Sequence, residues 1–341
     1  MVRICVLILG TITSFAAASH HSRGHFDDER IVELDGEVAS VFWRNPHVEL
    51  TLRTVTDGGE EQIWEIESDS VNNLIRRGIT ESVVNVGDRV TIAGTPSLRN
   101  EHHLLLVHVG LPGGETVVMM PSQARRVGLE VDGVGSQDAP LDESAVDAAI
   151  RQAQGIFRVW SLDRYGGGNS PTLTEAASAA VAAWNQERDD PTLRCEPPGM
   201  PSIMPNPYPM EFLAQGDDII LRLEEWDSTR TIHMGDPENP ATLPPSLMGY
   251  SAGHWEGDTL VVETSRISYP FHDVNGTPQS EDAVIVERFT LSEDDTQLEW
   301  EATITDPANF LGPAILRMAW QWVPGEEIKP YRCALPETEP A

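Results

Sequence analysis

Short runs of alternating hydrophobic and polar residues fill the first third of the chain beyond residue 30. They cover residues 31–42, 48–54, 63–67, 89–94 and 104–111. Alternation with a period of two is typical of strands that turn one face towards a core. We therefore expect a series of short strands in this region.

A short helix is predicted within this series of strands. Residues 71–77 read VNNLIRR, and the next residue is Gly78, a residue type expected just past the end of a helix. Three strands, a short helix and two further strands are the order of an OB-type barrel. We therefore expect an OB-like β-domain over residues 20–120.

Longer alternating runs occupy the last third of the chain. They cover residues 218–226, 229–234, 259–264, 283–291, 297–305 and 314–323. Consecutive strands separated by turn residues favour an antiparallel meander. We expect an antiparallel β-barrel-like domain over residues 195–341, reached through a proline-rich arm at residues 195–213. The predicted fold class is thus mainly β, with a small OB-like barrel and a larger carboxy-terminal barrel.

The segment between the two β-domains, residues 121–194, is predicted to be a linker with helices. Gly and Asp punctuate residues 128–140, which is typical of a loop. Residues 142–154 and 174–186 carry capping residues and apolar spacing that favour helices. Residues 157–162 between them favour a strand, followed by a loop at the glycine run 166–168.

The first 19 residues have the pattern of a secretory signal. Arg3 is followed by an apolar stretch at residues 4–15 and by the small residues 16–19, Ala-Ala-Ala-Ser. Such a stretch is too short to span a membrane. We therefore expect a periplasmic or secreted protein with no integral membrane segment after signal removal.

Two cysteines remain once the predicted signal, which contains Cys5, is removed. They are Cys195 and Cys333, and no Cys-x-x-Cys motif occurs. An even pair in an oxidising compartment favours a disulfide. Two separate free thiols are the alternative.

The chain is strongly acidic, with 54 acidic and 23 basic residues and a formal net charge of −31. Binding to a nucleic-acid backbone needs a basic surface, so we expect no nucleic-acid partner. The charge fits an acidic surface suited to saline surroundings, and it also fits a face for a cation. The partner expected is a small molecule or a metal ion.

Histidines gather in the amino-terminal region and suggest a metal site. Signal cleavage after Ala18 would leave Ser19-His20-His21 as the new terminus. A terminal amine, two amides and the imidazole of a third residue form a square-planar nitrogen set, which suits Cu²⁺. We predict metal ligands at His20, His21 and His47, with copper as the candidate cofactor. Adventitious binding at solvated histidines is the alternative.

Five residues of the carboxy-terminal domain are candidates for acid–base catalysis. They are Glu224, His233, His254, Glu287 and Glu301. Carboxylates and imidazoles do such work when burial moves their pKa values apart. This hypothesis predicts that at least two of them meet in an enclosed cavity. The alternative is an acidic outer face of the barrel.

Several short motifs are shared with a family of exported bacterial proteins. In the amino-terminal region they are His20-His21-Ser22, Phe26-Asp27, Gly36-Glu37-Val38, Asn45-Pro46-His47, Trp64 to Glu67 and Arg76-Arg77-Gly78. In the carboxy-terminal region they are MGYSAGHWEGDTLVVET at residues 248–264, Ser280 to Asp282, VERFTL at residues 286–291 and TITDP at residues 303–307. The chain resembles this uncharacterised family in an OB-like domain followed by a GHWEGDTLVVET-type β-domain. The resemblance implies export and fold more than chemistry. Tyr250 and Gln279 stand where histidine is expected in many relatives.

These observations lead to three hypotheses of function. The first is an extracytoplasmic binding or accessory protein for a small ligand or for copper. The second is an enzyme of lyase, isomerase or hydrolase type that acts on a small, partly apolar molecule in the carboxy-terminal barrel. The third is a structural protein of the envelope.

Overall fold

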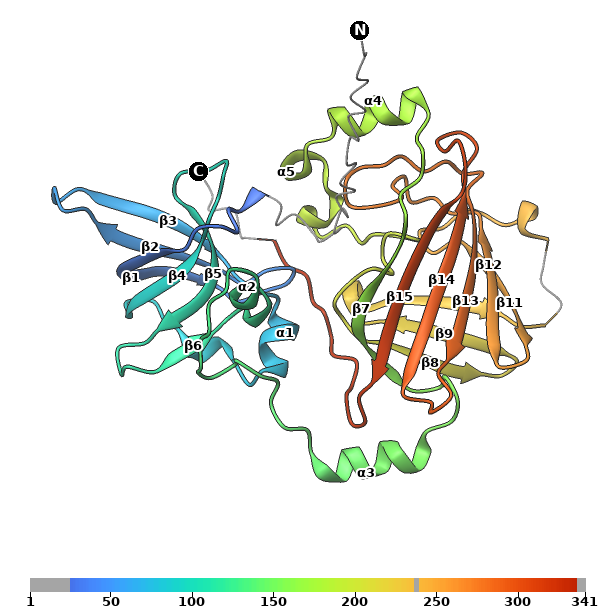
Figure 1. The fold of residues 1–341 in the computed structure, drawn as a ribbon, viewed down its shortest axis with the longest axis horizontal. Helices are drawn as coiled ribbons and strands as arrows, with labels where there is room; N and C mark the ends of the chain where they lie inside the picture. Colours follow the sequence, from blue (N-terminus) through green and yellow to red (C-terminus); the bar gives the residue numbers. More distant parts are fainter. Residues whose placement is uncertain (1–24, 236–238, 336–341) are drawn as a thin grey trace, which may run out of the picture.

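Two β-barrels, with few helices, make up the fold of the computed structural model (Figure 1). The structure describes residues 25–235 and 239–335. The mainly β fold class expected from the alternating pattern is confirmed. The predicted signal segment, His20 and His21 lie outside the described residues.

The amino-terminal barrel has five strands. They are β1 (Val32–Phe42), β2 (Glu49–Val55), β3 (Glu61–Glu67), β4 (Arg89–Pro96) and β5 (His103–Gly110). They follow the order β3-β2-β1-β4-β5, and a parallel pairing of β3 with β5 closes the sheet. Helix α1 (Val71–Arg76) lies between β3 and β4, as predicted, and β6 (Thr116–Val118) extends the edge at β5. Alternate residues such as Leu50, Leu52 and Ile92 are buried in its core.

The carboxy-terminal barrel has nine strands in the closed order β10-β11-β12-β13-β14-β15-β7-β8-β9. They are β7 (Val159–Asn169), β8 (Met210–Gln215), β9 (Asp218–Leu223), β10 (Ser228–His233), β11 (Tyr250–Glu256), β12 (Thr259–Ser265), β13 (Val284–Leu291), β14 (Gln297–Thr305) and β15 (Ala314–Trp322). All neighbours are antiparallel except β10 and β11, which pair in parallel. The prediction of a purely antiparallel meander is therefore wrong at this one pair of strands. A long connection lets β11 run in the direction of β10, as a parallel pair requires.

Strand β7 comes from the segment expected to be a linker. It pairs with β15 on one side and with β8 on the other, so it closes the barrel. Its glycine run lies against the backbone of β15, and a Cβ on Gly168 would lie 2.0 Å from the carbonyl oxygen of Ile315. Glycine is therefore required for this close approach. The segment supplies a barrel strand as well as helices.

Side chains fill the interior of the carboxy-terminal barrel. Its core includes Trp160, Phe212, Phe289, Trp300 and Trp320, all buried. Burial of such aromatic side chains dominates core energetics. The expected ligand cavity within this barrel is occupied by a packed core.

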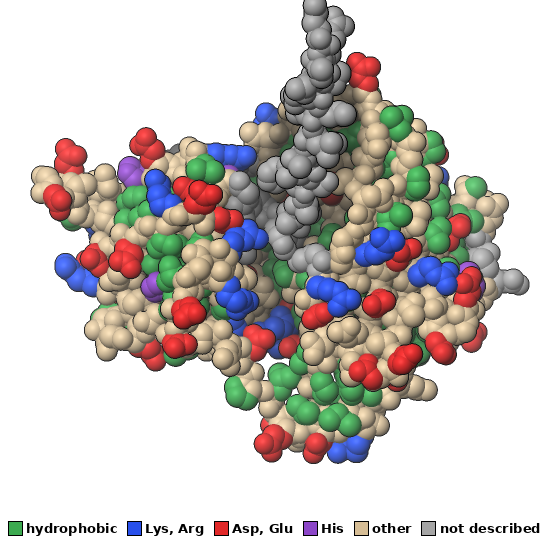
Figure 2. Space-filling view, viewed as in Figure 1, with side chains coloured by type: hydrophobic (Ala, Val, Ile, Leu, Met, Phe, Trp, Pro, Cys, Tyr) green, Lys and Arg blue, Asp and Glu red, His purple; other side chains and the backbone are tan. Residues whose placement is uncertain are grey.

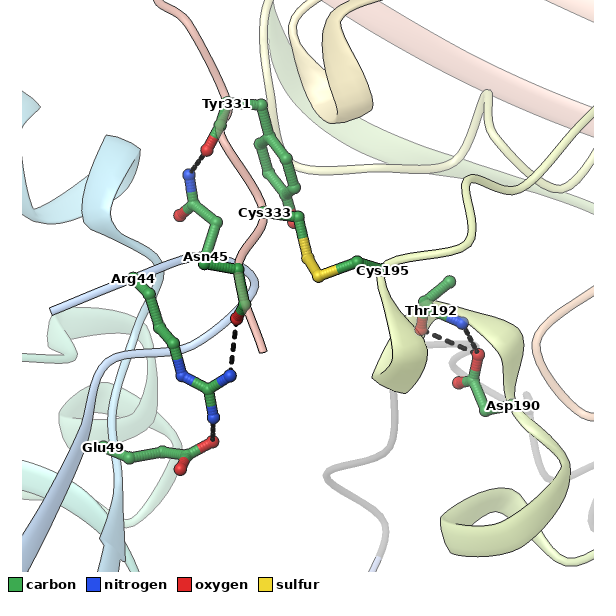
Figure 3. Close-up of a disulfide and its surroundings, with 9 residues drawn as sticks. Arg44, Asn45, Glu49, Asp190, Thr192, Cys195, Tyr331 and Cys333 are labelled. Atoms are coloured by element: carbon green, nitrogen blue, oxygen red, sulfur yellow. Dashed lines mark hydrogen bonds and ion pairs between the residues drawn. A yellow bond between two sulfur atoms is a disulfide. The ribbon is translucent and has the colours of Figure 1, made fainter. Parts of the chain in front are cut away.

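A segment that follows β15 joins the two barrels. Residues 323–335, here called the C-terminal strap, run between the barrels (Figure 1). Asn45 Nδ2 donates to the carbonyl oxygen of Tyr331 in the strap. The predicted disulfide between Cys195 and Cys333 is present and ties the strap to the turn after the short helix η3 (Pro191–Arg194) (Figure 3).

The α-helices are short and lie outside the barrels. Besides α1 they are α2 (Pro121–Arg126), α3 (Glu143–Gln152), α4 (Glu175–Ala183) and α5 (Gln186–Asp189). The remaining 3₁₀ turns are η2 (Glu81–Val83), η4 (Glu225–Asp227) and η5 (Pro240–Thr242). Hydrophobic side chains gather where α3 crosses below the two barrels (Figure 2). Within the described residues, no helix is long and apolar enough to cross a membrane.

Candidate functional site

Glu224, one of the predicted catalytic residues, joins the barrels. It follows β9 and is fully buried, with an exposed fraction of 0%. Arg76 of α1 donates to it through two guanidinium nitrogens, at 2.6 and 2.5 Å. Asn72 Nδ2 and the Lys329 backbone N–H complete its shell, at 2.9 and 2.8 Å. A carboxylate with four donors from both barrels and the strap positions the two barrels relative to each other.

Glu287 lies inside the carboxy-terminal barrel. Arg230 pairs with both of its oxygens, and the indole N–H of Trp300 donates to Oε1 at 3.1 Å. The guanidinium also donates to the hydroxyls of Ser251 and Thr264. The pair is satisfied by its own network, so Glu287 is part of the core.

The other three catalytic candidates lie on the outside of the barrel. Glu301 pairs with Arg317 at 2.7 Å, and His254 is 62% exposed and lies 3.3 Å from Glu256. His233 Nδ1 lies 3.0 Å from Asp218 Oδ2. An open hollow of about 640 Å³ adjoins this dyad, which is partly exposed to solvent. The structure does not bring the five candidates together in one cavity.

His47, a predicted metal ligand, lies at the edge of the amino-terminal barrel. Its Nδ1 is 3.0 Å from Glu67 Oε1, and Glu67 Oε2 is 3.7 Å from His103 Nε2. Among the described residues, no group of three or more His, Cys, Asp or Glu side chains is placed to hold a metal ion. The copper site expected at His20 and His21 stays a prediction from the sequence.

A pocket lies between the two barrels. It has a volume of about 330 Å³. The amino-terminal barrel, the connecting segment, the carboxy-terminal barrel and the strap all contribute to its wall. Its wall includes His47, Asp69, Asp190, Tyr208, Glu225, Trp226 and Tyr331. Ligand sites are commonly found in such clefts between domains.

Two of the three carboxylates in this wall have well-defined partners. Asp69 Oδ2 accepts from Arg77 at 2.9 Å, so its charge is paired. Asp190 caps η3 by accepting from the backbone N–H and the hydroxyl of Thr192, at 2.9 and 2.7 Å (Figure 3). Both carboxylates therefore have a structural role that the local fold explains.

The third carboxylate, Glu225, is different. Its side chain belongs to a residue that is only 5% exposed, and Oε2 accepts no hydrogen bond from any described residue. Burial, and then the charge of Asp190, raise the pKa of Glu225 to about 8, while the nearby Trp226 opposes this shift. Glu225 is therefore mostly protonated at pH 7. Such shifted groups in a cleft are candidates for a functional role.

Aromatic side chains form the wall beside Glu225. The ring centroids of Trp226 and Tyr331 are 5.1 Å apart, and those of Tyr208 and Tyr331 are 5.3 Å apart and meet edge to face. Burial raises the pKa of both tyrosines. Trp226 has a positive φ of 60°, a backbone conformation that is strained for a bulky residue. The sharp turn ends β9 and lets the chain carry Glu225 and Trp226 to the pocket.

Glu225→Gln is expected to raise the free energy of unfolding more at pH 8 than at pH 5. The unfolded carboxyl has its ordinary pKa of 4.5 and loses its proton across this range, whereas the folded carboxyl, with a pKa of about 8, retains it. The folded state therefore loses stability relative to the unfolded state as the pH rises from about 4.5 to about 8. Glutamine does not titrate and removes this loss, which is worth up to about 4 kcal/mol.

Urea unfolding at both pH values measures this difference. Glu263→Gln, on the exposed face of β12, is the matched control and should show the same small effect at each pH. An equal effect of Glu225→Gln at pH 5 and pH 8 would contradict the raised pKa.

The pocket residues were not identified from the sequence, apart from His47. Tyr208, Glu225 and Tyr331 belong to segments that lie far apart along the chain, and no shared motif links them. The signals that pointed to them were weak: an aromatic residue between prolines at Pro207-Tyr208-Pro209, and two acids at the end of a predicted strand. Only the folded arrangement brings them to one wall.

Comparisons with known proteins bear on the amino-terminal region. Residues 9–105 match DUF6152, a family of unknown function. No curated protein matches the chain. The match includes His47 and Asp69 of the pocket wall, whereas Glu225 and Tyr331 lie beyond it. Over residues 9–105 the chain is similar to the DUF6152 family.

Proposed function

We propose that this protein binds a small organic molecule in the pocket between its two barrels, as an exported binding or accessory protein. The observation that carries the proposal is Glu225, a buried carboxylate in the pocket wall with an oxygen that no described residue satisfies. An unsatisfied buried polar atom costs about 1–3 kcal/mol, and a bound ligand that donates to it offsets this cost.

An oxidising compartment outside the cytoplasm fits the disulfide between Cys195 and Cys333. The signal-like pattern of residues 1–19 supports the same location. Because the disulfide fixes the strap that supplies Tyr331, export and a complete pocket wall would be linked.

One observation also supports the enzyme hypothesis, and it is the raised pKa of Glu225. A carboxyl with a pKa of about 8 is a proton donor at neutral pH, as general acids are. Any catalysis would therefore be centred on the pocket between the barrels, since the carboxy-terminal barrel has a packed interior.

Binding is tested with matched sets of small amines, alcohols and carboxylates, among them benzylamine, benzyl alcohol and benzoate. We expect at least one set to bind the processed protein in calorimetric titrations. Leu193→Trp places a large side chain in the pocket wall and should weaken this binding at least about tenfold, or 1.4 kcal/mol.

Leu311→Trp is the matched control, because Leu311 is exposed and lies outside the pocket wall. It should leave binding unchanged. Absence of binding by every probe, or equal effects of the two tryptophan variants, would overturn the proposed function.

A further inference from the structure

We propose that the ligand of this pocket is a small organic cation, with its ammonium group against the Glu225 carboxylate and its carbon skeleton against the aromatic wall. This inference rests on the proposed function and names the class of ligand.

The charges around the pocket leave one place for a cation. Asp69 is paired with Arg77, and Arg126 in the wall is paired with Asp28 at 3.0 Å. Glu225 has Asp190 as its charged neighbour, and no ion pair joins Glu225 to a basic residue in the part of the chain that the structure describes. A positively charged ligand would therefore give Glu225 the basic partner that no described residue provides.

The unsatisfied oxygen of Glu225 selects a donor. An ammonium group offers hydrogen-bond donors and no acceptor, which matches Oε2, the carboxylate oxygen that accepts no hydrogen bond from a described residue. An anionic ligand would face the negative charge of Asp190, and that of Glu225 whenever this carboxyl is ionised, and would be disfavoured. A neutral donor is the remaining competitor, and the experiment below separates the two.

The aromatic wall favours an organic cation. Trp226, Tyr208 and Tyr331 line the same pocket as Glu225. A cation within about 6 Å of such a ring face gains about 0.5–2 kcal/mol, and the rings also bury the apolar part of a ligand. A bare metal ion would use neither property, and the described residues offer no group of three metal-ligating side chains.

Binding of a cation should release a proton. The groups that act on Glu225 are Asp190 before η3 and Trp226 beside it. Besides burial, the charge of Glu225 in turn raises the pKa of the phenol groups of Tyr208, Tyr331 and Tyr269. Burial raises the pKa of the three tyrosines, so they stay neutral near pH 7. Glu225 is then the group in this set that gives up its proton, because a cation favours the ionised carboxylate.

The test compares benzylamine with benzyl alcohol, which has nearly the same shape but no charge. We expect benzylamine to bind more tightly, and its affinity to rise about tenfold between pH 6 and pH 7, because each pH unit below the pKa ionises about ten times more Glu225. Benzyl alcohol should show no such rise. Calorimetry in two buffers of different ionisation enthalpy should report close to one proton released per bound benzylamine at pH 7.

The variant Glu225→Gln should remove both the preference for benzylamine and its pH dependence, whereas Glu263→Gln should retain them. Thermal unfolding of both variants confirms that they are folded. Equal binding of amine and alcohol by the unmodified protein, or no proton release, would overturn the inference that the ligand is a cation. The proposed function would then still stand. Absence of binding by all probes would overturn the proposed function itself.

Discussion

Arg230→Met is expected to lower the free energy of unfolding by about 3–5 kcal/mol, because it leaves the charge of Glu287 buried without its partner. Arg230 is 1% exposed and Glu287 is 0% exposed. In the variant, the indole N–H of Trp300 and the hydroxyl of Thr264, at 3.1 and 3.4 Å, would remain as donors to Glu287. Two neutral donors are too little to balance a carboxylate inside a packed barrel.

Urea unfolding of the single variant and of the double variant Arg230→Met/Glu287→Leu measures how much this ion pair contributes to the free energy of unfolding. The double variant should recover most of the loss, since it removes both charges and keeps the volume close to that of the original side chains. Arg222→Met is the control, because Arg222 pairs with Glu211 on the exposed face, where such pairs contribute less than about 1 kcal/mol. A double variant as unstable as the single one would contradict this account.

The second large effect is expected at the joint between the barrels. Arg76→Met removes the two guanidinium donors of Glu224 and leaves this fully buried carboxylate with Asn72 and the Lys329 N–H. We expect a loss of about 3 kcal/mol, near the lower end for a broken buried pair, because two hydrogen bonds remain.

In Arg76→Met, the lower free energy of unfolding should be accompanied by faster proteolysis within residues 323–335. The reason is that the guanidinium also contacts Glu326 and the carbonyl oxygen of Glu327 in the strap. Limited proteolysis and urea unfolding measure the two effects. Arg53→Met, on the exposed face of β2, should change neither. Unchanged cleavage of the strap in Arg76→Met would show that this contact does not hold the barrels together.

Much of the fold followed from the alternation of residue types along the chain. The strand predicted at residues 297–305 coincides with β14 (Gln297–Thr305), where buried residues alternate with less buried ones. The predicted helix that ends before Gly78 is α1. These elements bury one face each, so their pattern is visible in the sequence.

Strands β7 and β8 were harder to predict in full. The glycine run of β7 and the prolines that precede β8 are residue types typical of loops. In the structure, neighbouring strands on both sides compensate for this weak preference. Tertiary pairing therefore determined these strands more than local propensity.

The residues of the candidate site are positioned by the sharp turn after β9, which the alternation of residue types does not predict. Continued alternation would have placed Glu224 on the face opposite Leu223, and Glu225 on the same face as Leu223. Instead β9 ends at Leu223, and the positive φ angles of Trp226 and Asp227 turn the chain sharply. As a result, Glu224 reaches the joint between the barrels and Glu225 reaches the pocket.

The position of the strap in the sequence has a consequence for the order of assembly. Residues 323–335 follow every barrel strand, and none of these residues belongs to a strand of either barrel. Each barrel is thus able to complete its own strand pairing before the strap docks. Tyr331 reaches the pocket wall only with the strap, and oxidation of Cys333 with Cys195 then holds it there. Completion of the pocket wall would therefore be the last step, timed by the arrival of the strap in an oxidising environment.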